Sequence, residues 1–85
     1  MDSKTIATST LAHIETYYPQ YLHDVGLNDH PIVKISFYEV MIKMIEDGSL
    51  SDDKAQALVL HALRRYAMNL RTALALAMHR EHPSN

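Results

Sequence analysis

Two histidines near the end of the chain have the spacing of a metal-binding pair. His79 and His82 are three residues apart, and Glu81 lies between them. On a helix, this spacing puts both imidazoles on one face, where they could bind a divalent cation together with the carboxylate. A structural site requires four rigidly held ligands, however, and this pair precedes Pro83 at a helix end that we expect to fray. The sequence therefore predicts no metal site and no cofactor.

Carboxylates and an imidazole that could exchange protons occur in the first third of the chain. Glu15, His13 and Asp24 are residue types that serve as general acids and bases. A reaction also needs a concave pocket with a nucleophile or a metal, and three short helices enclose little volume. The sequence has no glycine-rich phosphate loop and no serine in a nucleophile-elbow pattern. We therefore predict that the protein is not an enzyme and has no catalytic residues.

The basic residues of the C-terminal region could contact phosphates or an acidic protein surface. Arg64 and Arg71 share one helical row with His61, and Arg65 is adjacent. Three or four cations give nucleic acid only a weak, salt-sensitive attraction. The two aspartates that precede this helix would also meet the DNA first if the helix entered a groove by its N-terminus. Nucleic-acid binding through Arg64, Arg65 and Arg71 is therefore the alternative function, and binding to a membrane surface is a third.

Charge is divided unevenly along the chain. Residues 1–53 carry three Lys and nine Asp or Glu, a net charge of −6, whereas residues 54–85 carry five Lys or Arg and one Glu, a net charge of +4. Such a division indicates that one part of the molecule faces the other, or that each part faces a partner of opposite sign. In an antiparallel two-fold dimer, the basic row would meet the acidic half of the other subunit.

The element that positions the basic row is one long helix. Residues 51–82 contain no Gly or Pro, and their apolar side chains recur at steps of three and four. This is the spacing at which two packed helices bury a seam, and a second apolar row widens it. We predict a dimer or partner interface that consists of Val59, Leu63, Tyr66, Leu70, Ala73, Leu74 and Ala77.

Two further helical segments precede the long helix. Apolar residues from Ala7 to Val25 follow helical spacing, but Pro19 removes a backbone donor, so this helix is expected to kink or to end and restart there. Gly26 suits the left-handed backbone angles that close a helix. A middle helix then begins at Pro31.

Capping residues define the ends of the last two helices. Asp29 or His30 is expected to cap the middle helix, which ends at Gly48. Ser51 is expected to cap the long helix, with the acidic side chains of the next two residues against the positive end of its dipole.

Composition limits the class of protein. Residues 1–85 are enough for one domain, and no segment alternates with the period of a strand. The chain has no cysteine, which suits a reducing cytosol, so we expect a cytoplasmic protein. Polar and charged residues interrupt every apolar stretch before it reaches membrane length. We predict an all-α fold of three to four helices: a broken N-terminal helix, a middle helix and a long C-terminal helix, forming a dimeric bundle.

The middle of the chain resembles a known family. The run that carries the resemblance extends from Glu39 to Ser51 and continues through Lys54 and the leucine-rich helix to Leu63. It is similar to the small enterobacterial biofilm and acid-resistance connector proteins of the AriR type, in which a short aromatic helix, like residues 14–18 here, precedes it. The resemblance covers about half of the chain and implies an all-helical homodimer that modulates signalling or transcription by binding a regulator, without catalytic residues. A shorter approach to the final segment, and the arginines there, depart from the pattern.

These observations together predict a small protein that works by packing against other proteins. We expect a homodimer in which the long helix supplies the seam and the two preceding elements cover its other flank. Its function would be that of an adaptor, regulator or inhibitor that recognises a further, unidentified protein.

Overall fold

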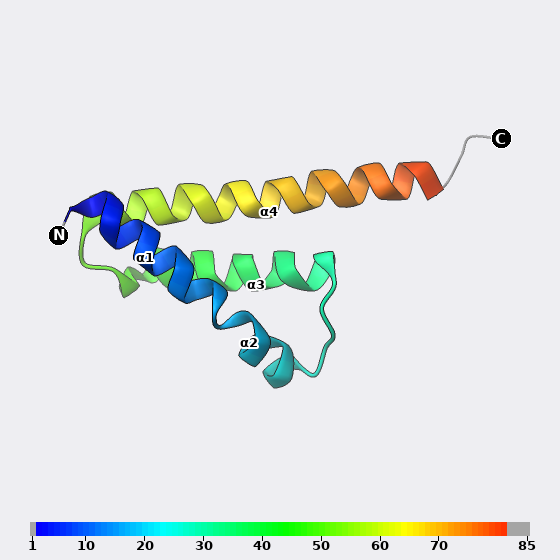
Figure 1. Cartoon of the computed structure of the whole chain (residues 1–85), viewed down its shortest axis with the longest axis horizontal. Helices are drawn as coiled ribbons and strands as arrows, with labels where there is room; N and C mark the ends of the chain where they lie inside the picture. The colour runs from blue at the N-terminus through cyan, green and yellow to red at the C-terminus, as the bar shows by residue number, and fades with distance from the viewer. Residues whose placement is uncertain (1, 82–85) are drawn as a thin grey trace.

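The computed structural model describes residues 2–81, and within them it contains helices and no strand. The α-helices are α1 (Ser3–Glu15), α2 (Tyr18–Val25), α3 (Pro31–Met44) and α4 (Asp53–Glu81), and a π-helical turn, η1 (Ile45–Ser49), follows α3. Figure 1 shows α1 crossing over α3, with α4 running along both and continuing past them. The predicted all-α fold, with a broken N-terminal helix, a middle helix and a long C-terminal helix, is confirmed.

The break in the N-terminal helix lies where Pro19 predicts it. Helix α1 ends at Glu15, and α2 begins at Tyr18 with Pro19 in its first turn, where the missing backbone donor has no intrahelical partner to lose. The amide of Tyr17 still donates to the carbonyl of Ile14 at 3.0 Å, so the chain turns tightly rather than opening into a loop. Gly26 then ends α2 with a φ of 69°, which is the left-handed conformation expected there.

Helix α3 begins at Pro31 and is capped by His30, one of the two expected candidates. The Nδ1 of His30 accepts a hydrogen bond from the amide of Ile32 at 3.1 Å. The predicted end at Gly48 agrees with the structure: regular α-helix continues to Met44, the turn Ile45–Ser49 follows it, and the backbone leaves helical angles at Gly48. Gly48 adopts a φ of 101° inside that turn, and this conformation reverses the chain toward α4.

The prediction that Ser51 caps the long helix is wrong by one residue. Asp52 is the cap: its Oδ1 accepts a hydrogen bond from the amide of Ala55 at 2.8 Å. The Asp52 carboxylate also accepts from the hydroxyl of Ser3 at 3.0 Å, which joins the start of α4 to the start of α1. The backbone bond from Ala55, with the Ser3 bond second, lowers the pKa of Asp52. A carboxylate can accept both hydrogen bonds at once, which favours Asp52 over Ser51 as the cap of α4.

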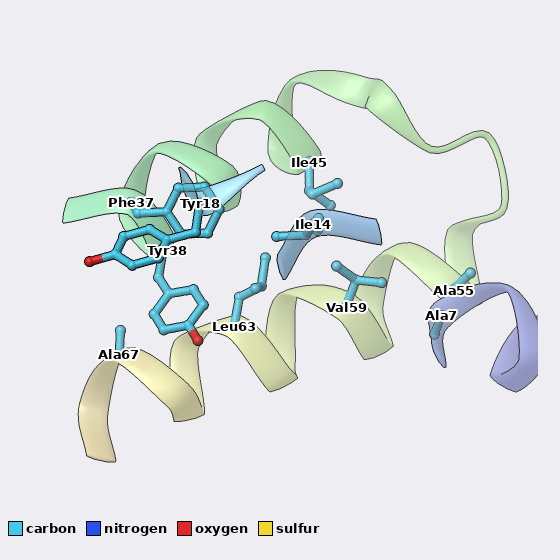
Figure 2. Close-up of a cluster of buried hydrophobic side chains, with 10 residues drawn as sticks. All are labelled: Ala7, Ile14, Tyr18, Phe37, Tyr38, Ile45, Ala55, Val59, Leu63 and Ala67. Atoms are coloured by element: carbon cyan, nitrogen blue, oxygen red, sulfur yellow. The ribbon is translucent and has the colours of Figure 1, made fainter. Parts of the chain in front are cut away.

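The core lies between the first half of α4 and the crossing of α1 over α3. Phe37, Val59 and Leu63 are the largest side chains with no exposed surface. The ring of Phe37 lies 5.1 Å from that of Tyr18, centroid to centroid, and all of these residues belong to one cluster (Figure 2). The cluster consists of Ala7, Ile14, Tyr18, Phe37, Tyr38, Ile45, Ala55, Val59, Leu63 and Ala67.

Candidate interaction surface

Helix α4 is longer than the body on which it packs. Leu70 is the last residue of α4 that packs against the core, and Arg71 is the last that forms an ion pair with α3. The helix then continues unbroken to Glu81. Figure 1 shows this part of α4 extending alone beyond the N-terminal end of α3. We call residues 72–81 the overhang; at a rise of about 1.5 Å per residue, it is about 15 Å long.

The overhang carries the same apolar face that the first half of α4 buries. Leu74 and Ala77 lie about three and four turns after Leu63, which is fully buried, so the three side chains point to nearly the same side of the helix. Leu74 is half-buried, whereas Ala77 is exposed and Met78 beside it is 53% exposed. An apolar face that is covered in one half of a helix therefore has no covering element in the other.

The residues predicted as an interface fall into two groups. Val59 and Leu63 are fully buried in the core of this chain, so their apolar surface is covered within the monomer. The apolar face of α4 is buried at these two residues because α1 and α3 pack against it. The remaining predicted residues retain exposed or half-buried surface. They are Tyr66, Leu70, Ala73, Leu74 and Ala77.

The basic row of α4 faces acidic side chains of the same chain. Arg64 forms an ion pair with Glu46, and Arg71 forms one with Glu39 at 3.0 Å. Arg65 is exposed and forms no ion pair among the residues that the structure describes. The sequence analysis gave two explanations for the uneven charge. These two ion pairs agree with the first, in which one part of the molecule faces the other.

The end of the body beneath the overhang is also apolar and acidic. Three large apolar side chains are about half exposed where α2 ends and α3 begins: Val25, Leu27 and Ile32. Asp24 and Asp29 are exposed in the same segment, which contains no Lys or Arg between Tyr18 and Pro31. We call residues 24–32 the α2–α3 end. The sequence analysis did not single out this segment, although three apolar residues beside Gly26 and Pro31 were a visible signal.

A cavity occupies the corner where the overhang meets the α2–α3 end. Its volume is about 450 Å³, and the residues that line it come from α3, from the loop before α3 and from the part of α4 that precedes the overhang. They are Asp29, His30, Pro31, Lys34, Tyr38, Tyr66, Asn69 and Leu70. The cavity therefore ends at Leu70, before the overhang begins.

A polar cluster lies behind that corner. The carboxylate of Glu15 accepts hydrogen bonds from the hydroxyl of Tyr38 at 2.7 Å and from the ammonium of Lys34 at 3.0 Å. The Lys34 nitrogen also lies 4.3 Å from the centre of the Tyr18 ring, within reach of a cation–π interaction. The Tyr18 hydroxyl donates to Asp29 at 2.7 Å. Burial, and then the hydrogen bond to a carboxylate, raises the pKa of both tyrosines, that of Tyr18 to about 12.

The hydrogen bonds of this cluster hold different elements of the fold together. They join α1 to α3 and the start of α2 to the loop after α2. Sequence reasoning grouped Glu15 with His13 and Asp24 as a candidate acid–base set, and the structure does not bring these three together. His13 instead lies 2.8 Å from the Tyr17 hydroxyl, and Asp24 accepts from Gln20 at 2.8 Å.

A second concave feature is a groove on the far side of α1. Its volume is about 720 Å³, and apolar side chains of α1, α3 and η1 form its floor, among them Ile14, Met41, Met44 and Ile45. No Asp, Glu, Lys or Arg lines it. Polar side chains also line it, among them His13 and Tyr17, whose ring nitrogen and hydroxyl lie 2.8 Å apart.

No arrangement of three or more metal-ligating side chains occurs within the described residues. His79 lies at the exposed end of α4, and His82 lies outside the described residues. Within the same part of the chain, no helix combines the length and apolar character needed to cross a bilayer. Comparison of the chain with protein-family models, with curated proteins and with solved structures finds no match in any of the three.

Proposed function

We propose that the protein is a small, non-enzymatic adaptor or regulator of the cytoplasm that acts as a helical homodimer and binds a further protein. The observation that carries this proposal is the overhang of α4. It continues the stripe that the core buries, yet Ala73, Ala77 and Met78 remain exposed. Exposed apolar residues that share one face of a helix are typical of a surface that packs against another polypeptide.

The dimensions of the molecule support the proposal. The molecule measures 55 × 26 × 19 Å, and its radius of gyration is 15.1 Å. A compact domain of this length would have a radius of gyration of about 12 Å. A small domain whose longest helix leaves the body gains stability if a second chain covers that helix.

Resemblance to the AriR-type connector proteins is part of the same proposal. It would make the further partner a regulator of signalling or transcription, bound by the dimer. The exposed Arg65, which has no acidic neighbour in an ion pair within the described residues, is then available to an acidic surface of that partner.

Two matched substitutions in the overhang test the dimer. Ala77→Glu places a carboxylate on the apolar face, and Ala75→Glu places one on another side of the same exposed turn. We expect the native chain and the Ala75→Glu variant to be dimers in size-exclusion chromatography with light scattering. The Ala77→Glu variant should dissociate at least about tenfold more readily, because burying an unpaired charge costs more than about 1.4 kcal/mol.

Nucleic-acid binding is the competing function, and a separate experiment distinguishes it. Two of the three arginines that would contact phosphates already pair with Glu39 and Glu46, and a phosphate would have to displace those carboxylates. We expect no gel shift with duplex DNA at physiological salt. A shift that Gln at positions 64, 65 and 71 together abolishes, and that weakens as salt rises, would contradict the adaptor proposal.

A further inference from the structure

The corner cavity between α3 and α4 is lined by charged, polar and aromatic side chains together. Asp29 contributes a carboxylate, Lys34 an ammonium group and Asn69 a side-chain amide. The rings of Tyr38 and Tyr66, whose centres lie 5.7 Å apart, form an aromatic wall. The cavity volume of about 450 Å³ falls within the range of about 300–1,000 Å³ that is typical of small-molecule sites. The cavity therefore has the size and the mixed lining of a ligand site.

The ammonium group of Lys34 is held in place by residues outside this cavity. Its nitrogen donates a hydrogen bond to Glu15 at 3.0 Å and lies 4.3 Å from the centre of the Tyr18 ring. Glu15 lines a neighbouring cavity and not this one. Among the described residues, Glu15 is the only hydrogen-bond acceptor of the Lys34 nitrogen. Two of the three ammonium hydrogens therefore remain for a ligand.

The carboxylate of Asp29 lies on another side of the same tyrosine. Its Oδ1 accepts from the Tyr18 hydroxyl at 2.7 Å, so Oδ2 keeps its full capacity to accept. Asp29 and Lys34 thus contact one aromatic side chain, the first at its hydroxyl and the second over its ring. Within residues 2–81 they form no ion pair with each other. A cation and an anion are therefore held close together with a space between them that a ligand can bridge.

Other lining residues add hydrogen-bond donors and apolar surface. The Nδ1 of His30 accepts from a backbone amide, so the neutral imidazole carries its proton on Nε2 and is a donor there. The Asn69 amide supplies a further donor and an acceptor. Pro31 and Leu70 line the cavity beside Tyr66, which is 38% exposed. A ligand that fits this lining combines a carboxylate, an ammonium group and an apolar body.

From this arrangement we infer that the corner cavity binds an α-amino acid with an aromatic or large apolar side chain. The ligand carboxylate pairs with Lys34, its ammonium group pairs with Asp29, and its side chain lies against Tyr66 and Leu70. A zwitterion has no net charge, so it satisfies both charges of the cavity at once through charge-assisted hydrogen bonds. This inference goes beyond the adaptor function proposed above and does not require the homodimer.

Titration of the isotope-labelled full-length chain with phenylalanine tests the site by nuclear magnetic resonance. We expect saturable shifts of the Asn69 side-chain amide and of the backbone amides of Asp29 and Lys34, with a Kd of about 1 mM or lower. Hydrocinnamate lacks the ammonium group and phenethylamine lacks the carboxylate, so each should bind at least about tenfold more weakly. Three results would each overturn the inference. They are no saturable shift at about 10 mM phenylalanine, shifts confined to the groove on the far side of α1, and equal binding of the three compounds.

A matched pair of substitutions assigns the ammonium contact. Asp29→Asn removes the charge but keeps an oxygen that can accept from Tyr18, and it should raise the Kd for phenylalanine at least about tenfold. The Kd for hydrocinnamate, which has no ammonium group, should not rise. Asp24→Asn removes an exposed carboxylate from the same segment that does not line the cavity, and should leave both constants unchanged.

A third variant provides a test that does not alter the contact with Tyr18. Asn69 is exposed on α4, so Asn69→Ala leaves the core intact and should weaken phenylalanine binding about fivefold, as loss of one hydrogen bond does. The amide spectrum of each variant verifies its fold. An unchanged Kd for folded Asp29→Asn or for Asn69→Ala, or equal losses in Asp29→Asn and Asp24→Asn, would show that the ligand does not occupy this cavity.

Discussion

Tyr18 and Tyr38 carry their hydroxyl groups at the edge of the core, and each donates to a carboxylate from another element. Tyr18 donates to Asp29 and Tyr38 to Glu15, both at 2.7 Å. Burial of the rings and the acceptor carboxylates both disfavour the phenolate, so the pKa of each hydroxyl is raised in the folded chain. These two residues therefore link the stability of the fold to pH on the alkaline side.

The sign of that dependence follows from the raised pKa of Tyr18. Its ordinary value is 10.0 and its value in the fold is about 12, so the unfolded chain loses the proton first. The stabilising contribution is complete below pH 10 and is lost as the pH rises toward 12. We expect the urea midpoint to fall across that window, and to fall less steeply in Tyr18→Phe, which has no proton to lose. A parallel fall in both proteins would show that Tyr18 does not contribute.

Some residue roles could be read from the sequence and others could not. Pro19, Gly26 and His30 act through their own backbone or through a neighbour two residues away, and local spacing reveals such roles. The bond of Glu15 to Lys34 joins residues nineteen apart in the chain, and it depends on how α1 crosses α3. No local pattern contains that crossing. The same holds for the Ser3 hydroxyl, whose contact with Asp52 favours that residue as the cap.

At the scale of elements, the two halves of α4 have different surroundings. Its first half has Ala55, Val59, Leu63 and Ala67 in the core, whereas the overhang exposes the continuation of the same stripe. Periodicity predicted the stripe correctly, but periodicity is uniform along the helix and does not indicate where the covering elements end. The length of α3 and the position of Pro31 determine that point, and the corner cavity marks it.

A pair of equal substitutions measures the difference between the two halves. Leu63→Ala removes a fully buried side chain, and Leu76→Ala removes one that is 56% exposed on the overhang. We expect the first to lower the free energy of unfolding by about 2–5 kcal/mol, because it leaves a cavity. The second should change it by less than about 0.5 kcal/mol. Chemical denaturation of the two variants side by side gives both values, and equal losses would contradict the assignment of the core.

At the scale of the whole molecule, the proposed homodimer would make stability depend on protein concentration. Association of folded chains adds a term to the free energy of unfolding that grows with the logarithm of concentration. We expect the melting temperature of the native chain to rise steadily between about 1 and 100 µM, a range that spans a micromolar Kd. The melting temperature of Ala77→Glu should rise less over the same range, because its dimer dissociates more readily. A native melting temperature that is constant would exclude association in that range.

The last turns of α4 have a further consequence for how the chain behaves when it is scarce. A ten-residue helical segment without tertiary neighbours is barely stable in water, so its amide protons should exchange with deuterium far faster than those around Leu63. Proteases would find their cleavage sites in the same turns. If the proposed homodimer covers these turns, chains that are concentrated enough to pair would be cleaved more slowly than scarce ones.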